Sequence, residues 1–164
     1  MYCVKMKGEI KMIQSVQEQE LTLSSNTSPI TFADTDLRTA SANCFNGWLN
    51  HNEGSATFNI VEGGIYEINF NANVTSATVG VVGLAIYADG LKLNGAETDA
   101  VVATAGEYSN VSMTKYVRVC GRGNVTITIN SVPTITYSGG ATPVVTDTEI
   151  PIIKNANISI KRYA

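Results

Sequence analysis

The single histidine, His51, is the residue best suited to acid–base chemistry in this sequence, and Glu53 stands two positions after it. Hydrolases that use a histidine base place it against an activated serine or cysteine, as in the GxSxG motif. No nucleophile context of this kind accompanies His51, which lies in the polar stretch GWLNHNEGS. We therefore interpret His51 as a hydrogen-bonded structural residue and predict no catalytic residues.

Two further sets of residues have side chains of the kinds that bind metals. Asp34 and Asp36, in ADTD, would share one face of a strand, but no EF-hand or nonapeptide spacing surrounds them, which favours a solvated turn. The cysteines Cys3, Cys44 and Cys120 include no CxxC pair, which argues against a zinc site. Cys44 and Cys120 either pair with each other or stay as buried thiols. We predict no metal and no cofactor.

Composition and charge exclude two classes of partner. The net charge is -3, and no run of Lys or Arg exceeds the pair Lys161 and Arg162, so we expect no nucleic acid partner. The longest apolar run, at 79–88, falls short of the roughly 20 residues that a membrane helix needs, so we expect no membrane partner. The N-terminal stretch lacks the apolar core of a secretory signal, which predicts synthesis in the cytoplasm without export by that route.

Apolar and polar residues alternate with a period of two along most of the chain, which predicts an antiparallel all-β domain. Turns separate the strands, such as Asp89-Gly90, whose residues tolerate positive φ, and the stretch around Gly121. The residues between the last two predicted strands, 138–151, are rich in Gly, Pro and Thr and are expected to form an exposed loop. The predicted strands are 30–33, 46–50, 55–61, 64–75, 79–88, 111–120, 124–130, 134–137 and 156–163.

The chain has the length of one domain. We predict a short extended N-terminal arm at 1–28 and one sandwich domain at 29–164. The stretch KGEIKM, at 7–12, is what a purine-rich ribosome-binding site and a start codon would encode in frame. Met12 is therefore a candidate initiator, in which case residues 1–11 lie upstream of the true start.

The segment VGVVGLAIYA, at 79–88, is apolar on both of its alternating faces. A strand of this kind has to be covered twice, by the core on one side and by something else on the other. We predict that a second subunit supplies the other cover, and the alternative is a long loop of the same chain. The predicted interface residues from this strand are Val79, Val81, Leu84, Ile86 and Tyr87.

A row of amides follows the polar face of the strand GIYEINFNANVT, at 64–75, whose other face is apolar. The row consists of Asn69, Asn71 and Asn73. In one interpretation it lines a polar seam of an oligomer, because amides donate and accept hydrogen bonds without the desolvation cost of charges. In the other it is a solvent-facing surface that resists edge-to-edge association.

Several phrases resemble the C1q/TNF-like jelly-roll family over about residues 45 to 163, namely GIYEINF, LAIYADG, YVRVCGRGNVTITIN and NISIKRY. The phrases GWLNHNEGS, ANVTS and YSNVSMTKYVRVC are similar to the bacterial and phage branch of that family. The resemblance implies a jelly-roll sandwich that forms a compact homotrimer and is not an enzyme. No collagenous stalk precedes the domain in this sequence, so the functions of animal members are not carried over.

The resemblance leads to an expected function as a phage virion structural protein, a trimeric capsid decoration or head-fibre-like protein. It would contact other virion proteins through the N-terminal arm and would reside in the virion. The alternative is a receptor-binding or carbohydrate-binding adhesive tip that recognises a host surface glycan through loops carrying Tyr108, Asn110 and Tyr137. A jelly-roll esterase or glycosidase is a third hypothesis.

Overall fold

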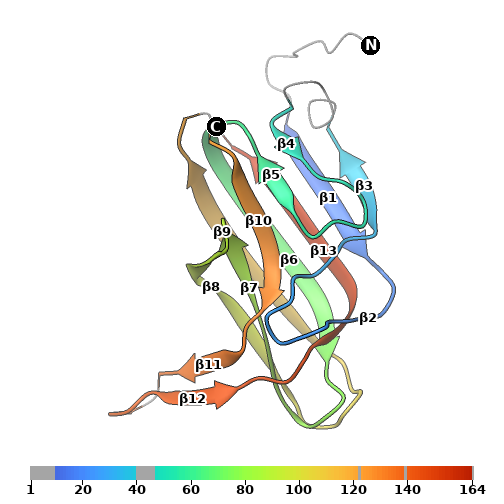
Figure 1. Ribbon diagram of the computed structural model, residues 1–164, viewed down its shortest axis with the longest axis vertical. Coiled ribbons are helices and arrows are strands. Elements are labelled where there is room, and N and C mark those ends of the chain that lie inside the picture. Colours follow the sequence, from blue (N-terminus) through green and yellow to red (C-terminus); the bar gives the residue numbers. More distant parts are fainter. Residues whose placement is uncertain (1–9, 40–46, 122, 139, 164) are drawn as a thin grey trace.

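The computed structural model describes residues 10–39, 47–121, 123–138 and 140–163. Within these residues the protein is all-β, with two antiparallel sheets that pack face to face and a two-stranded ribbon that projects from one end (Figure 1). The predicted fold class is confirmed. No described helix is long and apolar enough to cross a membrane.

The larger sheet has the strand order β3-β1-β13-β6-β9, and β2 pairs with β13 beside this path. Its central strands, β13 and β6, are also among the longest in the protein. The bounds are β1 (Lys11–Gln17), β2 (Leu21–Thr22), β3 (Asp34–Arg38), β6 (Gly64–Thr75), β9 (Ser109–Val119) and β13 (Ile152–Arg162).

The smaller sheet has the strand order β4-β5-β10-β7-β8, and the projecting ribbon is formed by β11 and β12. The hairpin between β7 and β8 turns at Asp89 and Gly90, which both adopt the positive φ that the sequence predicted. The bounds are β4 (Leu49–Asn50), β5 (Phe58–Ile60), β7 (Gly80–Ala88), β8 (Leu91–Val102), β10 (Val125–Ser131), β11 (Thr134–Tyr137) and β12 (Val144–Asp147).

The core lies between the two sheets and is built by the alternation of each strand. On β6, Tyr66, Ile68 and Phe70 point inward and are at most 1% exposed. The only tryptophan, Trp48, is fully buried and stacks on Tyr66, with ring centroids 5.9 Å apart. Trp48 therefore contributes to the packing of the core. Burial of large side chains is the main stabilising contribution to such a core.

The first described strand corrects the predicted N-terminal arm. β1 lies between β3 and β13, with Ile13 opposite Ile160 and fully buried, so Lys11–Gln17 belongs to the sheet. The period-two alternation of β1 is hard to recognise in the sequence, because its inward positions include polar residues. The hydrogen bonds of these residues are satisfied inside the chain. Ser15 shares a hydrogen bond with Thr35, 3.1 Å between the hydroxyl oxygens, and is fully buried.

Three other elements differ from the sequence-based expectation. ADTD does not form a solvated turn, because its aspartates lie on the edge strand β3. β8 was not predicted, because charged residues and an Asn-Gly pair interrupt its alternation. The expected loop 138–151 contains β12, which pairs with β11. All three are edge or projecting strands, where one side of the strand meets solvent and composition carries little signal.

Candidate interaction face

The outer face of the larger sheet carries the predicted asparagine row of β6. Because alternate residues of β6 face the core, Glu67 and the asparagine row point away from it. The neighbouring strand β9 places Thr114 opposite Asn69, Ser112 opposite Asn71 and Asn110 opposite Asn73. The face is thus a continuous array of amides and hydroxyls.

The asparagine row is hydrogen-bonded to its cross-strand neighbours within the sheet. The hydroxyl of Thr114 donates to Asn69 Oδ1 at 2.6 Å, and Asn110 Nδ2 donates to Asn73 Oδ1 at 3.2 Å. Asn71, between them, is exposed and has no side-chain hydrogen bond to any residue that the structure describes. Two of the three amides are therefore held by their own chain, and the seam between subunits stays a prediction.

A cluster of two tyrosines on one carboxylate occupies one end of this face. The hydroxyls of Tyr116 and Tyr163 donate to Glu67 Oε2 at 2.6 and 2.8 Å, and Asn69 Nδ2 donates to Glu67 Oε1 at 2.6 Å. The two rings meet edge to face, with centroids 6.0 Å apart, and Lys161 Nζ lies 4.9 Å from the centroid of Tyr163. We call Glu67, Tyr116 and Tyr163 the tyrosine–carboxylate cluster.

The hydrogen bonds of the cluster lower the pKa of Glu67 and raise the pKa of Tyr116. The bond from Tyr116, followed by those from Tyr163 and Asn69, holds the pKa of Glu67 below its ordinary value, because all three stabilise the carboxylate. Donation to Glu67 raises the pKa of Tyr116 to about 12. The hydrogen bond from Tyr116 therefore favours a charged Glu67 carboxylate next to a neutral Tyr116 phenol.

The two tyrosines of the cluster are held in place by hydrogen bonds and are nevertheless exposed to solvent. Tyr116 is 58% exposed and Tyr163 is 54% exposed, although their hydroxyls are fixed by Glu67. Tyrosines whose orientation is set in advance offer large contact areas at a low entropic cost, which is why they are enriched in interfaces. Sequence reasoning missed this cluster because its members come from β6, from β9 and from the residue that follows β13.

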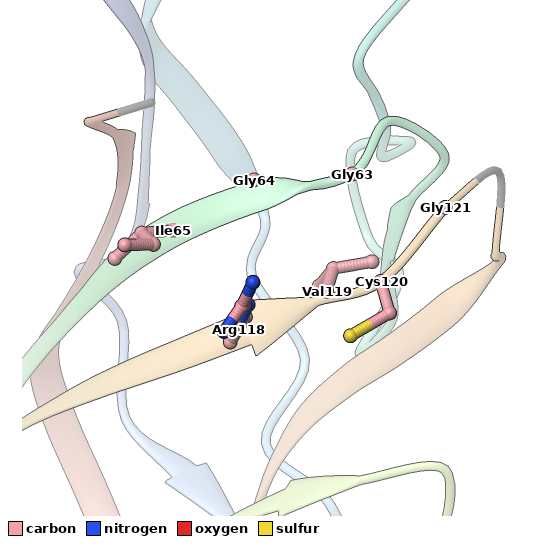
Figure 2. A pocket seen from close by; sticks show the side chains of 7 residues that line it. All are labelled: Gly63, Gly64, Ile65, Arg118, Val119, Cys120 and Gly121. Carbon is pink, nitrogen blue, oxygen red and sulfur yellow. The ribbon is translucent and has the colours of Figure 1, made fainter.

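A pocket of about 700 Å³ that is open to solvent adjoins the cluster, where β6 begins and β9 ends (Figure 2). Figure 2 shows the side chains of Ile65 and Arg118 on the two strands and the Cys120 thiol just beyond β9. The chain is tight here, because a Cβ added to Gly63 would lie 2.5 Å from the carbonyl oxygen of Gly121. Cys120 is exposed, which corrects the prediction of a buried thiol, and Cys44 lies outside the described residues.

The three residues predicted for a ligand loop do not converge. Tyr108 donates to Glu20 Oε2 at 2.6 Å and lies beneath Lys154 Nζ, which is 4.0 Å from its ring centroid. Asn110 bonds to Asn73 on the larger sheet, whereas Tyr137 donates to Asp99 Oδ2 of β8 at 2.9 Å. Tyr137 thus stands on the ribbon beside the smaller sheet, apart from the other two.

The predicted subunit interface on 79–88 is corrected in part. Leu84 and Ile86 are at most 1% exposed and face the core between the sheets, so they cannot contact another subunit. The opposite face of β7 is covered by Val132 and Ile135 of the same chain, with Val81 and Tyr87 packed at the margin. The alternative of a covering segment from the same chain is therefore correct there. Val79, which is 64% exposed, remains a candidate contact.

His51 is a buried structural residue. It is 4% exposed, its ring stacks on Phe58 with centroids 3.9 Å apart, and its Nδ1 lies 2.9 Å from the carbonyl oxygen of Thr57. Burial lowers the pKa of His51, since the charged imidazolium loses hydration. Among the described residues no group of three or more His, Cys, Asp or Glu side chains is arranged to hold a metal ion.

Comparison with solved structures identifies the fold. No family model matches the sequence, and no curated protein matches it significantly. The globular domain of the zebrafish complement 1qA protein is similar at a TM-score of 0.62 and 12% identity, covering 95% of this chain and 98% of that chain. Murine APRIL at pH 5.0 is similar at a TM-score of 0.58 and 8% identity, covering 94% of this chain and all of that chain. The chain therefore has the C1q/TNF-like jelly-roll fold.

Proposed function

We propose that this protein is a non-enzymatic structural module that forms a homotrimer through the outer face of its larger sheet. The observation that carries the proposal is the tyrosine–carboxylate cluster, in which two ordered tyrosines are more than half exposed. Ile65, which is 44% exposed, and Arg118 extend the same surface along the edge of the pocket. Aromatic side chains and arginine are the residue types that dominate the energy of protein interfaces.

The wider role that we propose is that of a phage virion protein which decorates a capsid as a trimer. It is supported by the resemblance of GWLNHNEGS, ANVTS and YSNVSMTKYVRVC to the phage branch of the family, and by a fold compatible with trimeric, non-enzymatic domains. Because Lys11–Gln17 is part of the sheet, the proposed N-terminal contact with other virion proteins cannot use those residues as a separate arm.

The native mass of the purified protein tests self-association, with two tyrosine variants as a matched pair. Tyr116→Ala removes an exposed tyrosine bonded to Glu67, and Tyr137→Ala removes one bonded to Asp99 beside the other sheet. Light scattering should give a trimer for the wild type and for Tyr137→Ala, and a smaller species for Tyr116→Ala. A monomeric wild type, or equal behaviour of the two variants, would contradict the proposal.

Particle analysis tests the virion role separately. Virus particles purified by density gradient from the native host should contain the protein at a copy number that is a multiple of three. Its absence from such particles, together with its presence in the soluble fraction of the cells, would exclude the decoration role and leave trimer formation unaffected.

The second candidate function is an adhesive tip, which the projecting ribbon favours. β11 and β12 extend from the sandwich (Figure 1), and Val144 and Val145 on this ribbon are 58% and 61% exposed beside Tyr137. Glycan-array binding that is lost in Tyr137→Ala and kept in Tyr116→Ala would support this function over the first.

A further inference from the structure

The pairing of the edge strand β8 with β7 is irregular around Asn94 and Gly95. Ala85 of β7 pairs with Glu97 while Tyr87 pairs with Lys92, so residues 93–96 have no partner in the register between the two strands. Gly95 has a φ of 67°, a backbone conformation that favours glycine. Asn94 and Gly95 are both exposed, and the peptide that joins them lies outside the ladder with β7.

We propose that Asn94 is a site of spontaneous covalent modification, at which its side-chain amide is converted into a carboxylate. The backbone nitrogen of Gly95 gives its proton to solvent base and attacks Cγ of Asn94, so that a new N–Cγ bond forms. The Cγ–Nδ2 bond breaks, and the amide leaves as ammonia after taking a proton from solvent. Water then opens the five-membered imide at either carbonyl, which yields aspartate or isoaspartate without any change of oxidation state.

The side chain of Asn94 is exposed and free to turn toward the nitrogen of Gly95. Gly95 has no side chain to shield its nitrogen, and the Asn94 amide has no hydrogen bond to any described residue that would hold it back. The neighbouring Asp89-Gly90 turn differs in this respect. There Asp89 Oδ1 accepts a hydrogen bond of 2.8 Å from the backbone nitrogen of Thr126, which keeps the carboxylate away from its own following peptide.

Lys115 of β9 supplies the feature that distinguishes this site from an ordinary Asn-Gly pair. Its Nζ donates a hydrogen bond to the backbone oxygen of Asn94, the oxygen of the peptide whose nitrogen attacks. When that nitrogen loses its proton, much of the negative charge of the amidate resides on this oxygen. The ammonium group therefore stabilises the attacking form, in the way that a fixed donor stabilises a developing oxyanion.

Peptide mapping of the purified full chain, aged in mildly alkaline buffer and digested in acid, measures the conversion. Asn94 should gain about one mass unit, with isoaspartate as the larger product, and Asn94→Gln should show no conversion there. Lys115→Met should slow the conversion about fivefold, equivalent to about 1 kcal/mol of transition-state stabilisation. Lys115→Arg should keep a rate near that of the wild type.

Two controls separate the role of Lys115 from general effects of charge or unfolding. Lys92→Met removes a cation of β8 that pairs with Glu97, and it should leave the rate at Asn94 unchanged. In concentrated urea the wild type and Lys115→Met should convert equally, because the contact to Asn94 is lost. The second Asn-Gly pair, Asn46-Gly47, serves as an internal reference, and its Asn46 lies outside the described residues.

Failure of the inference is distinct from failure of the proposed function, because the chemistry at Asn94 requires neither a trimer nor a virus particle. An unchanged Asn94 in a sample in which Asn46 converts would overturn the site. Equal native rates for the wild type and Lys115→Met would overturn the role of Lys115, as would a difference between them that persists in urea.

Discussion

The outer faces of the two sheets differ in composition and in what covers them. The face of the smaller sheet is apolar along β7, and Val132 and Ile135 of the following segment bury it within the same chain. The face of the larger sheet is polar along β6 and has no such cover among the residues that the structure describes, yet it presents the exposed tyrosine–carboxylate cluster. Apolarity in a strand thus indicates that the strand is covered, but it does not say by which segment.

The largest effect on stability is expected from truncating a side chain on the covered face, compared with the same change on the open face. Ile135→Ala should lower the free energy of unfolding by about 2 to 3 kcal/mol, because a side chain that is 3% exposed leaves a cavity over β7. Asn71→Ala, on the open face, should change it by about 0.5 kcal/mol or less. Denaturant titration measures both, and similar losses for the two variants would break the comparison.

A smaller effect is expected from crowding the covered face. A Cβ at Gly83 would lie 2.7 Å from Ile135 Cδ1 and 2.7 Å from Val132 Cγ2, so Gly83→Ala should cost about 1 kcal/mol. Ile135→Val removes the Cδ1 atom, and the double variant should therefore lose less stability than the sum of the single changes. Faster amide exchange in β11 and β12 of Gly83→Ala would show that the ribbon has been displaced.

The free energy of unfolding should depend on pH because of the buried His51. Because the pKa of His51 is lowered from 6.5, the unfolded chain binds this proton more readily, and stability present above pH 6.5 is lost as the pH falls below it. His51→Gln should flatten the stability curve in that region, measured by denaturant titration at several pH values. An unchanged slope would mean that other groups dominate there.

The smallest effect concerns the open face. Glu67→Gln should lower the pKa of Tyr116 from about 12 toward the ordinary tyrosine value of 10.0, and the ultraviolet absorbance of tyrosinate measures this change. Because Glu67 has a lowered pKa, its contribution to stability is present above pH 4.5 and is lost as the pH falls through the folded value. Asp99→Asn is the matched control, since it should affect only Tyr137.

Much of the fold could be predicted from the sequence where one face of a strand is buried. Gly64–Thr75 and Thr134–Tyr137 have the predicted bounds, and the Asp89-Gly90 turn has the predicted positive φ. β3 and β8 were missed because an edge strand tolerates charge and bulges. The tyrosine–carboxylate cluster was not predictable, because Glu67, Tyr116 and Tyr163 meet only through the pairing of β6 with β9 and β13.

The sequence by itself determined the sandwich, because a period-two pattern leaves each strand one apolar face that has to be buried. Tertiary structure alone decided which segment covers that face and which polar residues come together. Leu84 and Ile86 lie in the core, and Ile135 packs on the back of β7, where a second subunit was expected. Glu67 accepts hydrogen bonds from two tyrosines. These relations depend on strand order and register, which bring distant residues into contact and are not encoded in the local pattern of any single strand.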